Sequence, residues 1–291
     1  MAWEFDGLFD PIPKAEAGED LLTAYWRKED TAARVGQMKY RTCTIKAGTR
    51  LEAEIYPIFG RIQEQTAKKE KLNITAERQQ QLNTRRAKRQ LILLMETNFK
   101  VDEDLSVTLT YAGDEPSEKR CRKDIRNFLN RVKRQREKRK LPELKYIYAI
   151  GHDGSQRIHV HMVMSGGIDR TELEKIWGKG IANTYSLQSY GNGLQGMANY
   201  LYKQNEKARD RGERIGYHMW RGSRNLKKPK VHVSDTKMSN RKVKMIAQNF
   251  KNLSKEIMEK TYPGYTLEDV QVYFSDIVDG VYIRAVMRRL E

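Results

Sequence analysis

Alternating apolar and polar positions predict several short β-strands along the chain. Residues 40–46 and 51–56 alternate in this way, and the intervening Ala47-Gly48-Thr49 is typical of the turn of a β-hairpin. A second hairpin is predicted around Asp153-Gly154, a strong turn signal. Its strands would cover residues 145–150 and 157–164, further strands are predicted over 105–111 and 184–187, and a strand-like pattern covers 270–286.

Apolar positions at helical spacing predict five helices. The first would begin at Thr75, a suitable N-cap, and end near Asn98. The second, over residues 117–139, has an apolar stripe formed by Ile125, Phe128, Leu129 and Val132. The remaining helices are predicted over residues 169–177, 194–209 and 241–260.

The order of these elements indicates the fold class. Strands alternate with helices between residues 40 and 190, but hairpins outnumber parallel crossovers. This pattern favours an α+β fold in which helices cover an antiparallel β-sheet. Residues 1–37, with two early prolines and scattered acidic residues, indicate a peripheral N-terminal arm. We therefore expect a main domain over residues 38–235 and a C-terminal extension over residues 236–291.

The chain carries far more positive than negative charge. Lys and Arg number 55 against 38 Asp and Glu, which gives a formal net charge of +17. A surplus of this size favours a polyanionic partner, because basic groups displace counterions from phosphates on contact. Ribosomal and membrane-surface proteins have a similar charge, so the surplus narrows the class of partner without identifying it.

Cysteine usage and the first residues favour a cytoplasmic location. Cys43 and Cys121 lie far apart in the sequence, so a disulfide framework is not expected and a reducing cytoplasm is the simplest location. The segment from Met1 to Asp6 is acidic where a secretion signal carries positive charge. The longest aliphatic run, from Leu91 to Met95, is too short to cross a bilayer. We expect a soluble protein without a membrane partner.

Two histidines in one predicted strand are candidate metal ligands. His159 and His161 are separated by one residue, and alternate side chains of a strand project from the same face. The two imidazoles would therefore be close enough to share one metal ion. The alternative is a pair of exposed histidines on an amphipathic strand.

His152 is a candidate third ligand, because three of the five histidines fall within the same predicted hairpin. If Asp153-Gly154 forms a two-residue turn, His152 lies on the face of His159 and His161. A three-residue loop would change the parity and remove this candidate. The sequence leaves both alternatives open.

The helix predicted from Leu194 carries a tyrosine and a lysine one turn apart. Tyr200 and Lys203 are neighbours on a helix surface, beside the stripe that packs on the sheet. Near a metal ion that polarises a phosphodiester, Tyr200 is a suitable nucleophile, and the ammonium of Lys203 favours the phenolate. Tyr202 falls on the opposite flank of the stripe, which disfavours it as a second nucleophile.

Two basic segments are candidate DNA-binding surfaces. One is the end of the second helix and the other is the loop over residues 221–230, and both would follow a DNA backbone. The alternative for each is a solvated protein surface. The candidate contacts are Lys133, Arg134, Arg136, Arg224, Lys227 and Lys228.

The order of three short motifs resembles that of the HUH endonucleases. The motifs are Thr108-Leu-Thr-Tyr111, His159-Val-His161 and Tyr200-Leu-Tyr-Lys203. Within that superfamily the chain is similar to rolling-circle replication initiators of phages, plasmids and integrated elements. The similarity covers about residues 75–230 and includes Asn98-Phe99 and Ser223–Pro229.

The resemblance implies a ferredoxin-like antiparallel sheet with the histidine pair on a central strand, in a catalytic domain over residues 38–235. Mg²⁺ or Mn²⁺ would bind there and hold the scissile phosphate. Tyr200 would attack the phosphorus of single-stranded origin DNA, which leaves a free 3′-OH and a 5′-phosphotyrosine link. A host helicase and polymerase are further expected partners, since the sequence contains no Gly-rich phosphate loop ending in Lys-Ser/Thr.

One position departs from the resemblance. Many relatives have a glutamate at the end of the strand that precedes the histidine hairpin, where this chain has Gly151 followed by His152. Either His152 replaces the acid or the site lacks that ligand, so the metal preference is open.

Other functions remain open from the sequence. A relaxase or a single-tyrosine transposase would use the same site on another DNA, although relaxases place their tyrosine before the histidines and such transposases are shorter. An RNA-recognition module would bind without requiring His159, His161 and Tyr200 to converge. A two-histidine phosphoesterase needs two His-x-Ser/Thr motifs, and the sequence has a single one, His232-Val-Ser234.

Overall fold

The computed structural model describes most of the chain as two compact units. The described residues are 38–58, 75–151, 157–189, 192–204, 219–274 and 280–290. The first unit combines residues up to Ala87 with residues from Pro229 onward, and the second runs from Lys88 to Lys228. Helix α4 (Ala76–Asn98) contributes residues to both units.

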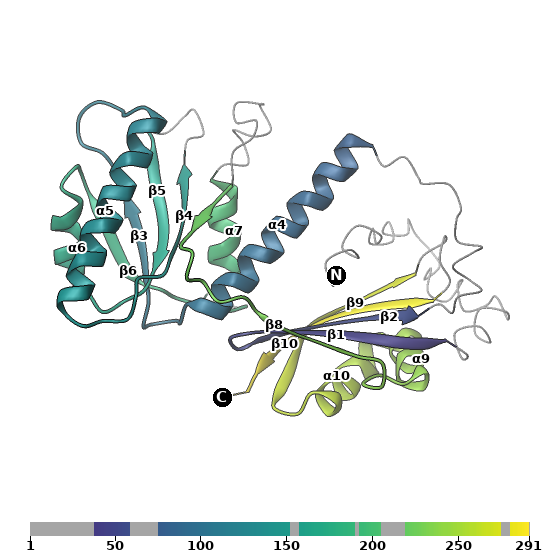
Figure 1. The fold of residues 1–291 in the computed structure, drawn as a ribbon. Helices are drawn as coiled ribbons and strands as arrows, with labels where there is room; N and C mark the ends of the chain where they lie inside the picture. Colours follow the sequence, from purple (N-terminus) through teal and green to yellow (C-terminus); the bar gives the residue numbers. More distant parts are fainter. Residues whose placement is uncertain are drawn as a thin grey trace. The chain divides into compact units, whose positions relative to one another are not determined.

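The second unit contains a five-stranded antiparallel sheet in the order β6-β3-β5-β4-β7. Helices α5 and α6 lie on one side of this sheet and α7 on the other (Figure 1). The strands are β3 (Leu105–Leu109), β4 (Tyr146–Gly151), β5 (His159–Met164), β6 (Ala182–Ser186) and β7 (Arg221–Gly222). The helices are α5 (Glu118–Lys138), α6 (Arg170–Trp177) and α7 (Gln195–Lys203).

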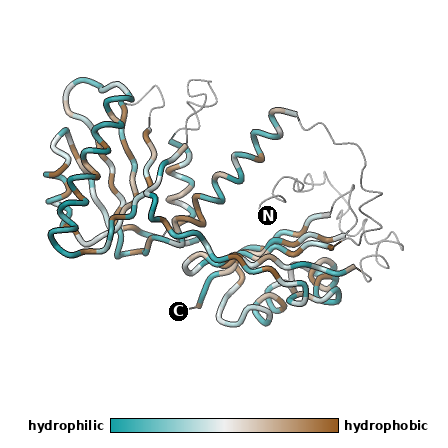
Figure 2. Tube along the Cα trace, viewed as in Figure 1, coloured by the Kyte–Doolittle hydropathy of each residue, from teal (hydrophilic) through white to brown (hydrophobic). Residues whose placement is uncertain are grey.

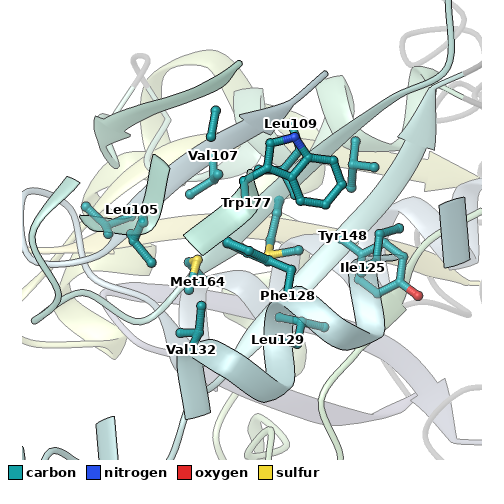
Figure 3. Close-up of a cluster of buried hydrophobic side chains, with 14 of the residues drawn as sticks. Leu105, Val107, Leu109, Ile125, Phe128, Leu129, Val132, Tyr148, Met164 and Trp177 are labelled. Carbon is teal, nitrogen blue, oxygen red and sulfur yellow. The ribbon is translucent and has the colours of Figure 1, made fainter. Parts of the chain in front are cut away.

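The core of the second unit forms between one face of the sheet and helices α5 and α6. Alternate residues of β3, β4 and β5 face this core, and the apolar stripe of α5 packs against them (Figure 3). Trp177 is fully buried at the end of α6, with its ring edge-on to Tyr111 and Phe128. Its indole N–H donates to the carbonyl of Thr110 at 2.8 Å, which ties α6 to the end of β3. The opposite face of the sheet is thereby left for other groups.

The first unit contains a second five-stranded antiparallel sheet, in the order β8-β1-β2-β10-β9. The apolar residues of one face pack against two helices, and apolar positions recur along its strands in Figure 2. The strands are β1 (Lys39–Ala47), β2 (Arg50–Ile58), β8 (Lys230–Ser234), β9 (Tyr265–Phe274) and β10 (Val281–Arg289). The helices are α9 (Asn240–Gln248) and α10 (Phe250–Thr261).

The other face of this sheet contains a buried ion-pair cluster. Glu52 is fully buried, and its carboxylate accepts from Arg50 at 2.9 Å and from Arg284 at 3.2 Å. Both carboxylate oxygens are therefore paired with a guanidinium, which limits the cost of burying the charge. The cluster joins β2 to β10, so it links the two chain segments that form the sheet.

The α+β fold class, with antiparallel sheets and covering helices, is confirmed and is consistent with a ferredoxin-like architecture. The units, however, differ from the boundaries expected from the sequence. The β1–β2 hairpin was expected within residues 38–235, yet β2 pairs with β10 from residues 236–291. Local periodicity predicts a strand but carries no information on its distant partner. The predicted arm over residues 1–37 lies outside the described residues.

Two predicted elements are each divided in the structure. The helix expected over residues 241–260 is interrupted at Asn249, which separates α9 from α10. The strand-like pattern over residues 270–286 belongs to two paired strands, β9 and β10. Among the described helices, none combines the length and the apolar composition needed to cross a bilayer.

Replacing Phe128 tests the core of the second unit. Phe128 is fully buried against Trp177, so we expect Phe128→Ala to lower the free energy of unfolding by about 3–5 kcal/mol. The exposed Arg126 on the same helix is the control, and Arg126→Ala should change stability by less than about 0.5 kcal/mol. Urea unfolding followed by circular dichroism measures both. Equal midpoints for the two variants would contradict the packing described here.

Candidate active site

The candidate site lies on the face of the sheet that does not contact α5 and α6. His159 and His161 belong to β5, the middle strand, and their ring centroids are 4.8 Å apart. On β3, Thr108 pairs with His161, while β4 places Ala149 and Gly151 opposite His161 and His159. The small side chains on β4 leave space above the strand for the two imidazoles.

His161 is held between a strand and a helix. Its Nδ1 is 3.1 Å from the hydroxyl of Thr108, and its Nε2 is 3.0 Å from the hydroxyl of Tyr200. Burial, with a smaller contribution from the adjacent His159, lowers the pKa of His161 to about 4. The ring is therefore neutral near pH 7, and one of its nitrogens is free to accept a hydrogen bond or to bind a metal ion.

Tyr200 is both exposed to solvent and in contact with His161. It projects from α7 with 46% of its surface exposed, and its ring centroid lies 4.7 Å from that of His161. Partial burial raises the pKa of the phenol, although a hydrogen bond with Gln204 acts in the opposite direction. The phenol is therefore protonated near pH 7. When Nδ1 of His161 donates to Thr108, Nε2 accepts a hydrogen bond from the phenol.

Gln204 is a site residue that the sequence analysis missed. Its amide nitrogen donates to the carbonyl of Tyr200 at 3.2 Å, and its Oε1 lies 3.4 Å from Nε2 of His159. Nδ1 of His159 is 2.8 Å from the carbonyl of Arg157, which can only accept, so Nδ1 carries the hydrogen. In the neutral ring, Nε2 and Oε1 are then two acceptors facing each other. Such a pair suits a cation between or beside them.

The i,i+4 spacing of Tyr200 and Gln204 is the signal that would have identified Gln204. Residues four apart lie on the same face of a helix, so a residue after a candidate nucleophile at this spacing is a candidate neighbour of the same site. Lys203 received attention in the sequence because of its charge. The structure leaves Lys203 exposed at the end of α7, and no described hydrogen bond or ion pair joins it to Tyr200.

Gly151 explains how the site departs from the glutamate pattern. A Cβ atom built on Gly151 would lie 2.4 Å from Nε2 of His159, closer than any stable contact. A side chain at position 151 therefore cannot coexist with the observed position of this imidazole. His152, the third ligand considered from the sequence, lies outside the described residues. Within the described part of the chain, no three His, Cys, Asp or Glu side chains gather as a metal site.

Tyr202 has a different environment from Tyr200. Only 1% of its surface is exposed, and the ammonium of Lys88 from α4 lies 5.0 Å from its ring centroid. A substrate cannot reach the Tyr202 hydroxyl without movement of the helix. The structure thus agrees with the helical argument that disfavours Tyr202 as a second nucleophile.

A buried carboxylate from α4 anchors the start of α7. Glu96 is 7% exposed, and its Oε1 accepts from the backbone N–H of Leu194 at 2.9 Å. Leu194 is the N-cap residue of α7 and supplies no side-chain cap of its own. The negative charge near the N-terminus also interacts favourably with the helix dipole. Glu96 therefore fixes the helix that presents Tyr200 and Gln204.

The structure corrects one candidate DNA contact. Arg136 is 4% exposed, and its guanidinium donates to the carbonyls of Pro142 at 2.9 Å, of Ser165 at 3.4 Å and of Gly166. Burial lowers its pKa. Position 136 follows Val132 by four residues, so it belongs to the buried stripe of α5 and holds two loops together. It does not lie on a surface available to DNA.

The other candidate contacts lie at the surface and remain predictions. Arg134 is exposed and Lys133 is half-buried on α5, while Arg224, Lys227 and Lys228 are exposed. The backbone N–H and carbonyl of Lys227 each bond the side chain of Asn98 at 2.8 Å. The two outlying segments of the resemblance, Asn98-Phe99 and Ser223–Pro229, are therefore in contact.

One comparison with known proteins bears on this site. Residues 104–208 match a family model of replication-associated proteins, the ORF2 type. This region is similar to replication-associated proteins. It covers about a third of the chain and runs from the start of β3 past α7, so it includes His159, His161 and Tyr200. No curated protein and no solved structure matches the chain.

Replacing Glu96 tests the anchor of α7. We expect Glu96→Ala to leave the buried N–H of Leu194 unpaired and to cost about 1–3 kcal/mol. Glu96→Gln retains an acceptor oxygen and should cost less. Hydrogen exchange measured by mass spectrometry should show faster exchange in α7 for Glu96→Ala than for Glu96→Gln. Unchanged protection of α7 in both variants would show that the contact does not hold the helix.

Proposed function

We propose that the chain is a rolling-circle replication initiator that nicks single-stranded origin DNA with Tyr200. The observation that carries the proposal is the position of the Tyr200 hydroxyl. It lies 3.0 Å from Nε2 of a neutral, buried histidine, while the side chain as a whole remains 46% exposed. A phenol in this position is held by the protein and is accessible to a substrate. The similarity of residues 104–208 to replication-associated proteins supports the biological role.

The proposed reaction is a transesterification at phosphorus. The phenol of Tyr200 loses its proton, a bond from its oxygen to phosphorus forms, and the bond from phosphorus to the 3′ oxygen breaks. The leaving oxygen takes up a proton and becomes the free 3′-OH, so the step needs no net proton and no external energy source. The product is a 5′-phosphotyrosine link that conserves the phosphodiester bond energy. Lys203, one turn from Tyr200, would favour the phenolate by its positive charge.

Three groups on this face fit a divalent cation. They are Nε2 of His159, Nε2 of His161 and Oε1 of Gln204, and the unprotonated pair formed by His159 and Gln204 supports this assignment. A bound ion would polarise the scissile phosphate as a Lewis acid. Of the two ions expected, Mn²⁺ fits two imidazole nitrogens better than Mg²⁺, which prefers oxygen ligands.

Adduct formation tests the proposed nickase. Purified protein, Mn²⁺ and labelled single-stranded DNA from its own locus should give a covalent protein–DNA band on denaturing gels. We expect Tyr200→Phe to abolish the band, because it removes the attacking oxygen while keeping the ring. The matched control is Tyr202→Phe, which changes a buried hydroxyl on the same helix and should retain the band. Tight DNA binding by the unmodified protein without any adduct would instead indicate a non-catalytic binding protein.

Replacing Gly151 tests the proposed metal site without removing a ligand. The added methyl group of Gly151→Ala meets only the ring of His159, so the ring should rotate away while the fold persists. We expect Mn²⁺ binding, measured by calorimetry, to weaken on the order of 10–100-fold, as when ligand orientation is disturbed in other metal sites. Gln204→Ala should also weaken binding. Unchanged Mn²⁺ affinity in both variants, with unchanged melting temperatures, would reject this ligand set.

A further inference from the structure

The face that carries the candidate site is open along the edge strand β6. Two large apolar side chains project there, Ile181 with 65% and Tyr185 with 61% of their surfaces exposed. Asn183, between them, is also exposed, whereas Ala182 and Thr184 are buried on the opposite face. The alternation shows that Ile181, Asn183 and Tyr185 form one row along the strand, called the β6 row below.

The strand register places the β6 row on the same face as the histidine pair. Asn183 pairs with Thr108 of β3, and Thr108 pairs with His161 of β5, so these three residues lie in one line across the sheet. Tyr185 pairs with Ser106, one step further along. Two strand spacings across and two residues along place Tyr185 on the order of 12 Å from His161. That separation is comparable to one or two nucleotides of an extended strand.

Packing does not explain these exposed side chains. An edge strand that faces solvent is usually protected by charged residues, yet the β6 row is apolar, amide and aromatic. A protein partner would require a much larger continuous patch, and the described exposed apolar residues of this face are limited to Ile181 and Tyr185. An unpaired base needs only a flat ring on which to stack and a polar group at its edge. Tyr185 provides the first and Asn183 the second.

Charge at the end of the strand favours a nucleic-acid occupant. The guanidinium of Arg170 donates to the hydroxyl of Ser186 at 2.7 Å, which holds a positive charge beside the last residue of β6. Arg170 itself is exposed, so it remains accessible to a phosphate. The chain as a whole has a formal net charge of +17, which adds a general attraction for a phosphate backbone.

We propose that the β6 row is a binding site for unpaired nucleotides next to the scissile phosphate, with one base stacked on Tyr185. This inference rests on the proposed nicking of single-stranded DNA, because it assigns the row to the strand whose phosphate reaches Tyr200. Asn183 contacts a base edge, and Arg170 contacts a phosphate. Ile181 provides an apolar surface for the neighbouring sugar or base.

Equilibrium binding separates this proposal from catalysis. In a full-length Tyr200→Phe background, which forms no adduct at Tyr200, fluorescence anisotropy with labelled oligothymidylate measures the affinity directly. We expect Tyr185→Ala to weaken binding about tenfold, the effect of losing one aromatic stacking partner, while Tyr185→Phe binds as the parent does. Val231→Ala is the matched control, since Val231 is also an exposed apolar strand residue, in the other unit.

Abasic substitution identifies the stacked base. Removing one base at a time from the oligonucleotide should weaken binding to the parent at one position, and that position should lose its effect in Tyr185→Ala. Equal affinity of Tyr185→Ala and the parent would overturn the proposal, as would an equal loss in Val231→Ala. The outcomes are independent of the nickase test. Adducts formed as efficiently by Tyr185→Ala as by the unmodified protein reject the row alone, whereas Tyr185-dependent binding without any adduct rejects only the nickase.

Discussion

The alternation of side chains along β5 determines where every group of the candidate site lies. Val160, Met162 and Met164 face the core formed with α5 and α6, so His159 and His161 must face the other side. Antiparallel pairing then fixes which residues of β3 and β4 lie beside each imidazole. A shift of one residue in this register would bury the histidines and expose the core, so packing of the core also positions the site.

Helix α7 completes the site from above the sheet. Its buried residues Ala198, Leu201 and Tyr202 hold one side of the helix, and Glu96 fixes its N-terminus. With the helix fixed, Tyr200 and Gln204 are directed to His161 and His159 respectively. Gly151 contributes by having no side chain, because any Cβ atom there would displace the His159 ring. The site thus depends on four chain segments that are distant in the sequence.

Local patterns in the sequence were sufficient for part of this arrangement. Period-two alternation placed both histidines on one face, and helical spacing separated Tyr200 from the buried Tyr202. The same spacing, applied to Arg136, would have predicted its burial, but its charge drew attention first. Gln204 was missed because an uncharged amide has no distinctive pattern. The pairing of β2 with β10 was beyond reach, since it joins segments that no local signal connects.

Identification of the residue that carries DNA tests the central claim most directly. The unmodified protein would be incubated with Mn²⁺ and single-stranded DNA of its own locus, digested with nuclease and protease, and analysed by tandem mass spectrometry. The account predicts a nucleotide attached through a 5′ phosphate to Tyr200. A nucleotide on Tyr202 or on another residue, or a cleaved strand with no attached peptide, would contradict the assignment of Tyr200 as the nucleophile.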